Sequence, residues 1–359
     1  MRVFFIFIFV LVFCGLTAKV RHKEVFFDAS FPAPKHPFGN GYSAEKALLG
    51  RYFFYEKRLS INGTKSCGSC HDPAFSFTDG YRKSVGALGD GLQRNAPPLV
   101  NLAYNSHYTW ANKDITALEK QIVMPLFSAK EMGLDAANTD ILRVLEADLV
   151  YKPLVAEVFP HQKLRYEHVV KAVACFVRTL VAANAPYDQY TYRKNAAAVS
   201  SAVLRGEKLF FGKKTDCSQC HSGINFNEEP KKHQNAFFNI GLYNIDGSGS
   251  YPNQDQGLVA HTGVAADMGR FRVPTLRNLA FTAPYMHDGS MASLGEVVDF
   301  YAQGGQRAAA GGEGRHSPLK APRITGFMLS AQERTDLLSF LWSLSDSSFV
   351  QNPAFANPF

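Results

Sequence analysis

Cysteine is scarce in this sequence, whose 359 residues include only six. Four of the six stand in two copies of one short motif, and Cys14 lies in an N-terminal apolar run, which leaves Cys175. Cys175 lies in an apolar segment with helical spacing, where a buried and inert thiol is the common role. We therefore expect no structural disulfide.

Beyond residues 3–13, the sequence lacks an apolar stretch long enough for a membrane-spanning helix. That first run follows Arg2, is too short to cross a bilayer comfortably and ends near small residues, as the apolar core of an export signal does. We predict a signal peptide over residues 1–18 and a periplasmic protein. Lipoprotein attachment through Cys14 is the weaker alternative, because Phe13 is bulky for the position before such a cysteine.

Strict alternation of apolar and polar residues is also rare, which argues against a β-rich fold. Apolar residues instead recur at three- and four-residue intervals over 140–147 and 166–182. Ser43 is suited to cap a helix, and capping boxes begin at Ser293 and Ser330. The sequence therefore predicts a mostly α-helical fold.

Long loops are expected at 244–256, which is rich in Gly, Asn and Asp, and at 304–322. No nucleic-acid-binding motif is present. The formal net charge of +7 would steer an acidic partner protein toward the surface, although a solvated basic surface explains it equally well.

The motif Cys-x-x-Cys-His occurs twice, at 67–71 and 217–221. It is the attachment motif of a c-type heme, because two thiols one turn apart can bond the two vinyl groups of a porphyrin and the next His can bind the iron. A redox dithiol would prefer one copy on a βαβ pattern, and a zinc site would leave both histidines unexplained. The sequence therefore predicts two covalent hemes, held by these residues: Cys67, Cys70 and His71 for the first, and Cys217, Cys220 and His221 for the second.

A Gly-led aromatic run precedes each motif, at 50–54 and again at 206–211. This weak repeat favours a duplicated cytochrome c domain. The polar stretch 192–200 is the expected boundary. The predicted organisation is a signal peptide (1–18), an extended segment (19–42), an N-terminal cytochrome c domain (43–192) and a C-terminal one (193–359).

The first heme lacks an obvious second axial ligand, because no His or Met occurs from residue 72 to residue 106. The loop at 80–94 therefore cannot supply the usual strong ligand, although His107 and Met124 remain available in principle. An open axial position is what peroxide binding requires.

At this level of detail the chain resembles the di-heme cytochrome c peroxidase superfamily, its MauG-like branch, and in particular the MbnH-like di-heme enzymes. The resemblance extends from about Ser43 to Leu344 and is carried by these segments: 63–71 (GTKSCGSCH), 77–80 (FTDG), 94–97 (RNAP), 99–104 (LVNLAY), 109–112 (TWAN), 271–278 (FRVPTLRN) and 282–289 (TAPYMHDG).

The resemblance implies a role for several residues near the first heme. Gln121, Pro125 and Glu131 match the distal wall, with Glu131 as the acid–base that moves a proton between the two peroxide oxygens. Trp110 matches a tryptophan that carries charge between the hemes, although a Trp is more often core filling. Many MauG-like enzymes read Trp-Asp-Gly-Arg here, whereas this chain reads Trp-Ala-Asn-Lys, so the polar surroundings differ.

The resemblance also implies a calcium site between the domains. Asn95 and the backbone carbonyls of Arg272 and Pro274 match its ligands, and oxygen ligands suit calcium. A structural Asn that caps a turn is the alternative.

At the second heme, di-heme peroxidases place a Met where this chain has Tyr301. Leu294, Val297 and Tyr301 share a face of the predicted helix, so Tyr301 should point inward. A phenolate ligand stabilises oxidised iron, whereas a thioether favours electron collection. A buried, hydrogen-bonded Tyr is the alternative, with Met268, Met286 and Met291 as competing ligands.

These features give three hypotheses. The first is a periplasmic enzyme that uses hydrogen peroxide to reach a high-valent di-heme state and oxidises a partner protein. By resemblance, that partner is a copper-binding protein whose tryptophan becomes kynurenine. The second is a peroxidase that draws electrons from a small cytochrome or cupredoxin. The third is a non-catalytic electron carrier with two closed hemes.

Overall fold

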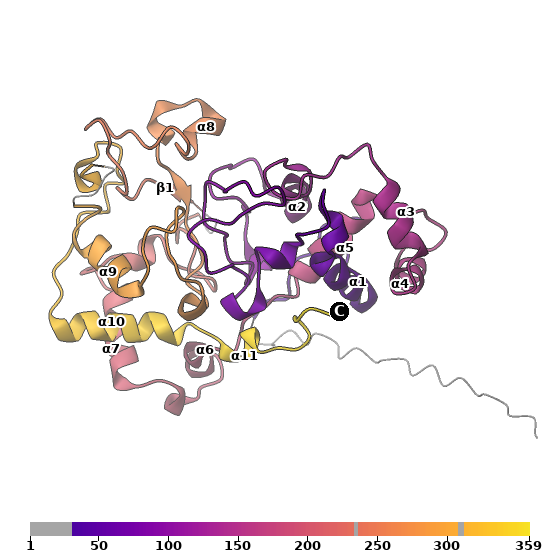
Figure 1. Cartoon of the computed structure of the whole chain (residues 1–359). Coiled ribbons are helices and arrows are strands. Elements are labelled where there is room, and N and C mark those ends of the chain that lie inside the picture. The colour runs from indigo at the N-terminus through magenta and orange to yellow at the C-terminus, as the bar shows by residue number, and fades with distance from the viewer. Residues whose placement is uncertain (1–30, 233–235, 308–311) are drawn as a thin grey trace, which may run out of the picture.

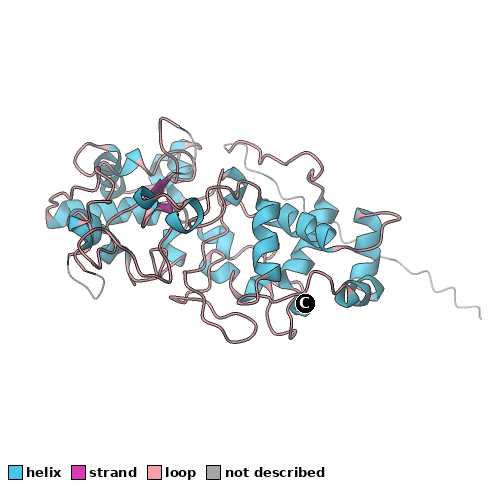
Figure 2. Cartoon of the chain, turned by 90° about the horizontal axis from the view of Figure 1, so that it is seen from above, coloured by secondary structure: helices cyan, strands magenta, loops and turns pink. Residues whose placement is uncertain are grey.

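The computed structural model describes residues 31–232, 236–307 and 312–359, so the predicted signal peptide and Cys14 lie outside the described residues. Helices and loops make up nearly all of it (Figure 2), which confirms the predicted fold class. The α-helices are α1 (Ala44–Tyr55), α2 (Leu118–Phe127), α3 (Asp140–Ala147), α4 (Tyr151–Val158), α5 (Tyr166–Val177), α6 (Pro186–Thr191), α7 (Ser201–Phe211), α8 (Val259–Thr262), α9 (Leu294–Ala302), α10 (Ala331–Ser343) and α11 (Ser347–Val350). Strands β1 (Phe237–Phe238) and β2 (Phe271–Arg272) pair antiparallel.

The first domain is built around α1 and α5, which pack against each other (Figure 1). Gly50 of α1 lies where an added Cβ would be 1.9 Å from the backbone oxygen of Ala172 in α5. A larger residue would therefore force the helices apart. Phe53 and Phe54, which follow Gly50, are buried in the core of this domain.

The second domain repeats this arrangement with α7 and α10 (Figure 1). An added Cβ at Gly206 of α7 would be 2.0 Å from the backbone oxygen of Asp336 in α10, and Phe210 is buried in the second core. The glycine and the aromatic run before each heme motif therefore serve one purpose in both domains, which is close helix packing. The predicted limits of the two domains stay a prediction.

Local capping explains where several helices begin. The side chains of Ser43, Ser293 and Ser330 accept hydrogen bonds from the first turns of α1, α9 and α10, as predicted. The predicted helix over 166–182 ends earlier, at Val177. Asn101 of the first domain takes the following segment out of the helix, because its backbone N–H donates to the Leu180 carbonyl and its side chain accepts from the Ala182 N–H.

The C-terminal segment returns to the first domain (Figure 1). Phe349 and Phe355 are buried in the first core, and the Tyr55 hydroxyl donates to the Phe355 carbonyl at 2.6 Å. The domain that carries the second heme motif therefore also supplies part of the first core. None of the helices in the described ranges combines the length and apolar character needed to cross a membrane.

Candidate active site

The first heme motif begins in a tight 3-10 turn, Cys67–Ser69, just after the Ser66 cap. The Nδ1 atom of His71 lies 2.8 Å from the Phe77 carbonyl oxygen. A ring that uses Nδ1 in this way presents Nε2 to a metal, which is how iron-binding histidines are held. Gly68 fits under Tyr55, because an added Cβ would be 2.5 Å from that ring. The local structure therefore fits a covalent heme with His71 as its ligand.

The second motif has the same local structure in the 3-10 turn Cys217–Gln219. Nδ1 of His221 lies 2.8 Å from the Phe226 carbonyl oxygen, which again presents Nε2. Burial lowers the pKa of His221 to about 4, so the ring stays neutral and able to bind a metal at neutral pH. The two motifs share the 3-10 turn and the hydrogen bond that holds the His ring, whereas the residue before the turn is extended at Ser66 and left-handed at Asp216.

The zinc alternative finds no support in the part of the chain that the structure describes. No group of three or more His, Cys, Asp and Glu side chains is close enough there to hold a metal ion. The four motif cysteines form no disulfide with one another. Each pair is therefore available for two thioether bonds.

Glu131 follows α2 and lies near the first heme motif. Burial is the largest cause of the raised pKa of both Cys67 and Cys70, and the Glu131 carboxylate adds to it in each case. Burial also raises the pKa of Glu131 itself. Its backbone is fixed by the Ala87 N–H, which donates to the Glu131 carbonyl at 2.7 Å, and an added Cβ at Gly86 would be 3.2 Å from the Glu131 Cα.

Gln121 and Pro125 both lie on α2. The Gln121 side-chain oxygen is buried and has no hydrogen-bond partner among the described residues, as expected of a group that meets a bound molecule. Two residues, Met124 on the same helix and His107, remained as possible axial ligands of the first iron. Met124 is 43% exposed, and the His107 ring packs edge-on against Phe237 of β1, 5.4 Å between centroids.

Trp110 is held by both domains. Its indole N–H donates to the Asn95 carbonyl at 2.9 Å, and its own carbonyl accepts from the Arg272 N–H at 2.7 Å. The Arg272 guanidinium lies over the indole, 6.0 Å from its centroid. The structure thus brings together three of the residues that the resemblance singled out, at the place where the domains meet.

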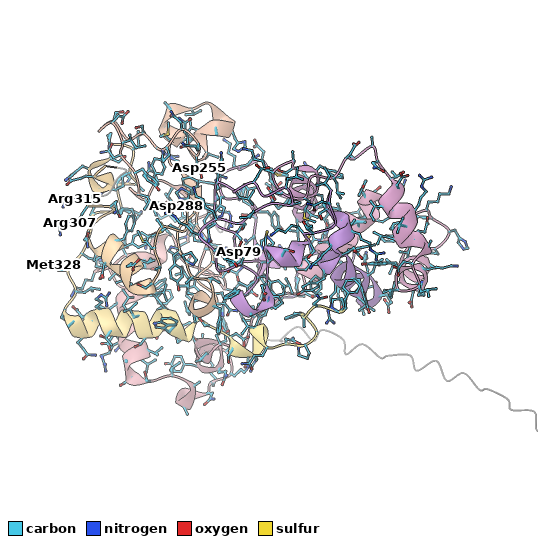
Figure 3. All side chains as sticks on the ribbon, in the orientation of Figure 1. Asp79, Asp255, Asp288, Arg307, Arg315 and Met328 are labelled. Carbon is cyan, nitrogen blue, oxygen red and sulfur yellow. The ribbon has the colours of Figure 1, made fainter. Side chains whose placement is uncertain are left out.

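Arg94 and Asp255 form a second link between the domains, which the sequence reasoning missed. The guanidinium donates twice to the carboxylate, at 2.6 and 2.8 Å. Asp255 and Asp288 both lie close to His287, and both are labelled in Figure 3. Arg94 lies in segment 94–97 of the resemblance, so a signal for this residue was present, but its partner Asp255 lies in none of those segments and could not be assigned without the fold.

The predicted calcium ligands are partly committed to protein contacts. The Asn95 side-chain nitrogen donates to the Tyr81 carbonyl at 2.8 Å, which leaves the side-chain oxygen for a cation. The nearby Arg272 guanidinium is buried and donates to the carbonyls of Thr109 and Val273. The donor set of one amide oxygen and the carbonyls of Arg272 and Pro274 suits a hard cation, and calcium stays a prediction.

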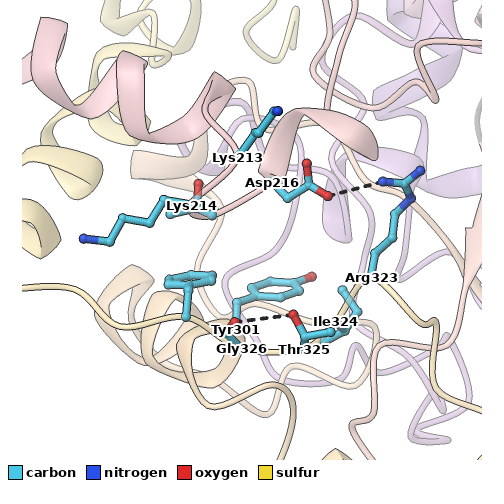
Figure 4. A pocket seen from close by; sticks show the side chains of 10 residues that line it. Lys213, Lys214, Asp216, Tyr301, Arg323, Ile324, Thr325 and Gly326 are labelled. Carbon is cyan, nitrogen blue, oxygen red and sulfur yellow. Dashed lines mark hydrogen bonds and ion pairs between the residues drawn. The ribbon is translucent and has the colours of Figure 1, made fainter.

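Tyr301 lies near the second heme motif. It lines a cavity of about 240 Å³ together with Asp216, the residue before Cys217. Figure 4 shows the Tyr301 ring between the segments 213–216 and 323–327. Burial chiefly, and then the Cys220 and Cys217 thiols, raise the pKa of Tyr301. A phenolate there needs a cation beside it, which a ferric iron would provide.

One apolar cluster contains both Trp110 and Tyr301, and we call it the junction cluster. Its buried members are Trp110, Ala111, Leu242, Tyr251, Phe271, Met291 and Phe300, and its partly buried members are Ile240, Tyr243, Met268, Tyr285, Met286, Val297 and Tyr301. The three competing methionines belong to it as well. It forms a continuous packed path between the domains.

Comparison with known proteins agrees with this geometry. A sequence profile described as di-haem cytochrome c peroxidase matches residues 44–197. The chain is 33% identical over 331 residues to the methylamine utilization protein MauG of Methylorubrum extorquens, covering 92% of this chain and 84% of that protein. It is 34% identical over 348 residues to the cytochrome-c peroxidase IdrP1 of a Pseudomonas species, covering 89% and 86%.

A solved structure is also similar over most of the chain. It is that of a MauG-like protein associated with microbial copper homeostasis, with a TM-score of 0.88 and 40% identity. The match covers 92% of this chain and 98% of that one.

The chain belongs to the di-heme cytochrome c peroxidase and MauG family. It is therefore an oxidoreductase that uses peroxide, and its cofactors are two c-type hemes. Both statements confirm the predictions from the sequence.

Proposed function

We propose that this protein uses hydrogen peroxide to oxidise a partner protein outside the cytoplasm, in the periplasm. The observation that carries the proposal is Tyr301, which lies beside the second heme motif. Di-heme peroxidases have a Met at this position. Further support comes from the MauG-like protein associated with microbial copper homeostasis, which is 40% identical.

When bound, the two hemes supply the redox chemistry, which is the reduction of peroxide and the storage of oxidising equivalents. His71 and His221 are the proposed proximal ligands, and Tyr301 is the proposed distal ligand at the second heme. The protein's own groups then have to bind peroxide, move its proton and connect the two sites.

Glu131 is the proposed proton carrier at the first heme. Its carboxylate accepts a proton from the peroxide oxygen nearer to the first heme. It then delivers that proton to the oxygen farther from the heme, which leaves as water. The buried Gln121 side chain orients the peroxide through a hydrogen bond, and Pro125 shapes the wall of the pocket. Trp110 passes electrons between the domains. A calcium ion at Asn95, Arg272 and Pro274 would hold the two domains together around Trp110.

The proposed partner is a copper-binding protein whose tryptophan is converted to kynurenine, as the MbnH-like resemblance implies. Oxidation proceeds over a distance, so the partner side chain does not enter a heme pocket. The second candidate function, a peroxidase supplied with electrons by a small cytochrome or cupredoxin, is favoured by the similarity to the cytochrome-c peroxidase IdrP1.

The test compares the holoprotein with its Tyr301→Phe variant. Peroxide is added with a candidate copper-binding protein from the same organism, and the partner's peptides are analysed by mass spectrometry. We expect the mass change of a tryptophan converted to kynurenine with the wild-type protein and its loss with the variant. Unmodified partner together with rapid oxidation of a reduced cytochrome would support the peroxidase instead.

A further inference from the structure

Tyr243 lies at the edge of the junction cluster, half-buried and paired with a carboxylate. Its hydroxyl donates to Asp288 Oδ2 at 2.5 Å. The Asp288 carboxylate is itself buried and lies 3.9 Å from the Arg82 guanidinium of the first domain, which is largely exposed. Burial, and then the bond to Asp288, raise the pKa of Tyr243, so the phenol keeps its proton at rest. The pair therefore stands between the packed interior and the surface.

Aromatic rings connect Tyr243 to the interior. Its ring is 5.3 Å from that of Tyr251, and Tyr251 is 6.0 Å from Phe271. These rings belong to the same cluster as Trp110 and Tyr301. Short steps between packed side chains lead from the heme-side residues to Tyr243.

The proton acceptor sets Tyr243 apart from two other tyrosines of the cluster. The Tyr251 hydroxyl donates to the Asn239 side-chain oxygen, and the Tyr285 hydroxyl donates to the Leu279 carbonyl. Neither an amide nor a carbonyl takes up a proton at neutral pH. Loss of an electron from a tyrosine makes its hydroxyl strongly acidic, so a carboxylate partner makes that loss far easier.

Location sets Tyr243 apart from the other tyrosine–carboxylate pairs. Tyr151 donates to Glu56 at 2.8 Å within the first core, and Tyr187 donates to Glu207 at 2.6 Å within the second. Among the pairs in the described residues, that of Tyr243 is the one in the cluster that holds Trp110 and Tyr301.

We propose that Tyr243 and Asp288 form a proton-coupled relay through which oxidising equivalents reach the protein surface. The Tyr243 O–H bond breaks, its proton moves to the Asp288 carboxylate, and its electron travels inward through the junction cluster to the site oxidised by peroxide. An electron from a partner protein then restores the phenol, and the proton returns from Asp288. The relay rests on the peroxide chemistry of the proposed function.

The test uses the holoprotein, rapid mixing with peroxide without a partner, freezing, and electron paramagnetic resonance. We expect a tyrosine radical signal in the wild type and its loss in Tyr243→Phe. Asp288→Asn keeps the shape of the side chain but removes the base, and we expect it to lose most of the signal. Tyr187→Phe is the matched control, because it removes a tyrosine–carboxylate pair of the same domain outside the cluster, and it should keep the signal.

Heme absorption, followed in the same samples, separates the relay from the proposed function. A normal response of the hemes to peroxide without a tyrosine signal in the wild type would overturn the relay alone. The same holds if Tyr243→Phe keeps the wild-type signal. Hemes that do not respond to peroxide in the wild type would overturn the proposed function and the relay with it.

Discussion

Individual side chains near the first heme motif have environments matched to proton transfer. Glu131 is half-buried and lies near the cysteines of that motif, whereas the buried Gln121 oxygen has no hydrogen-bond partner among the described residues. Burial disfavours the charged carboxylate, which brings the pKa of Glu131 closer to the pH at which the protein works. An exposed Glu would be a weaker base at that pH.

We predict that Glu131→Gln slows the reaction with peroxide by roughly a hundredfold or more, because a positioned acid–base contributes about that much. In the wild type the carboxylate must be ionised to accept the peroxide proton. The rate should therefore fall as the pH is lowered through the raised pKa of Glu131. This fall should occur at a higher pH than for an ordinary Glu, whose pKa is about 4.3.

Stopped-flow absorption of the hemes measures this rate. Glu157→Gln, an exposed carboxyl on α4, is the matched control and should react like the wild type. An equal rate in Glu131→Gln and Glu157→Gln would remove Glu131 from the mechanism.

At the scale of the elements, the molecule uses one helix pair twice. α1 packs on α5 and α7 packs on α10, and in each pair a glycine lets one backbone touch the other. The heme motif follows each first helix after a short connection, and its 3-10 turn contacts that helix. This arrangement explains why the sequence repeats glycine and aromatic residues before the motif.

We predict that Gly50→Ala lowers the stability of the first domain. The new Cβ would lie 1.9 Å from the Ala172 backbone oxygen, and overpacking of this kind costs about 1–3 kcal/mol. The better helix propensity of Ala returns at most about 1 kcal/mol. The midpoint of thermal unfolding of the holoprotein measures the difference.

Gly41→Ala is the control for that substitution, because nothing lies within 4 Å of its added Cβ and its φ is not positive. It should unfold close to the wild-type temperature. Equal midpoints for the two variants would show that the α1–α5 contact tolerates a side chain.

At the scale of the whole molecule, the end of the chain supports the first heme site. The Phe77 ring packs against Phe349 and Phe355, with centroids 5.8 and 6.3 Å away. The Phe77 carbonyl in turn fixes the His71 ring. The C-terminal segment is thus connected to His71, the proposed iron ligand of the first heme, through one buried phenylalanine.

We predict that Phe355→Ala lowers the unfolding temperature and changes the absorption spectrum of the first heme. Phe355 is 3% exposed, and truncation of a buried Phe costs about 3–5 kcal/mol. Phe359→Ala is the control, because Phe359 is 62% exposed, and it should change neither property. A lower unfolding temperature with an unchanged spectrum would separate the tail from the heme site.

The sequence by itself determined the features that depend on local spacing. Two Cys-x-x-Cys-His motifs predicted the hemes, three serines predicted helix starts, and the 3.6-residue period predicted α3. The predicted end of the helix over 166–182 was wrong, because Asn101, far away in the chain, forms hydrogen bonds with Leu180 and Ala182, which follow α5. Local patterns carry no information about such a distant partner.

Only the tertiary structure decided which side chains meet between the domains. The Arg94–Asp255 bond, the Arg82–Asp288 contact and the burial of Phe355 in the first core join residues of the two domains that lie far apart in the sequence. Their energies come from desolvation and close packing, which exist once both domains are folded and in contact. The sequence named Trp110 and Tyr301 separately, and the fold placed them in one cluster.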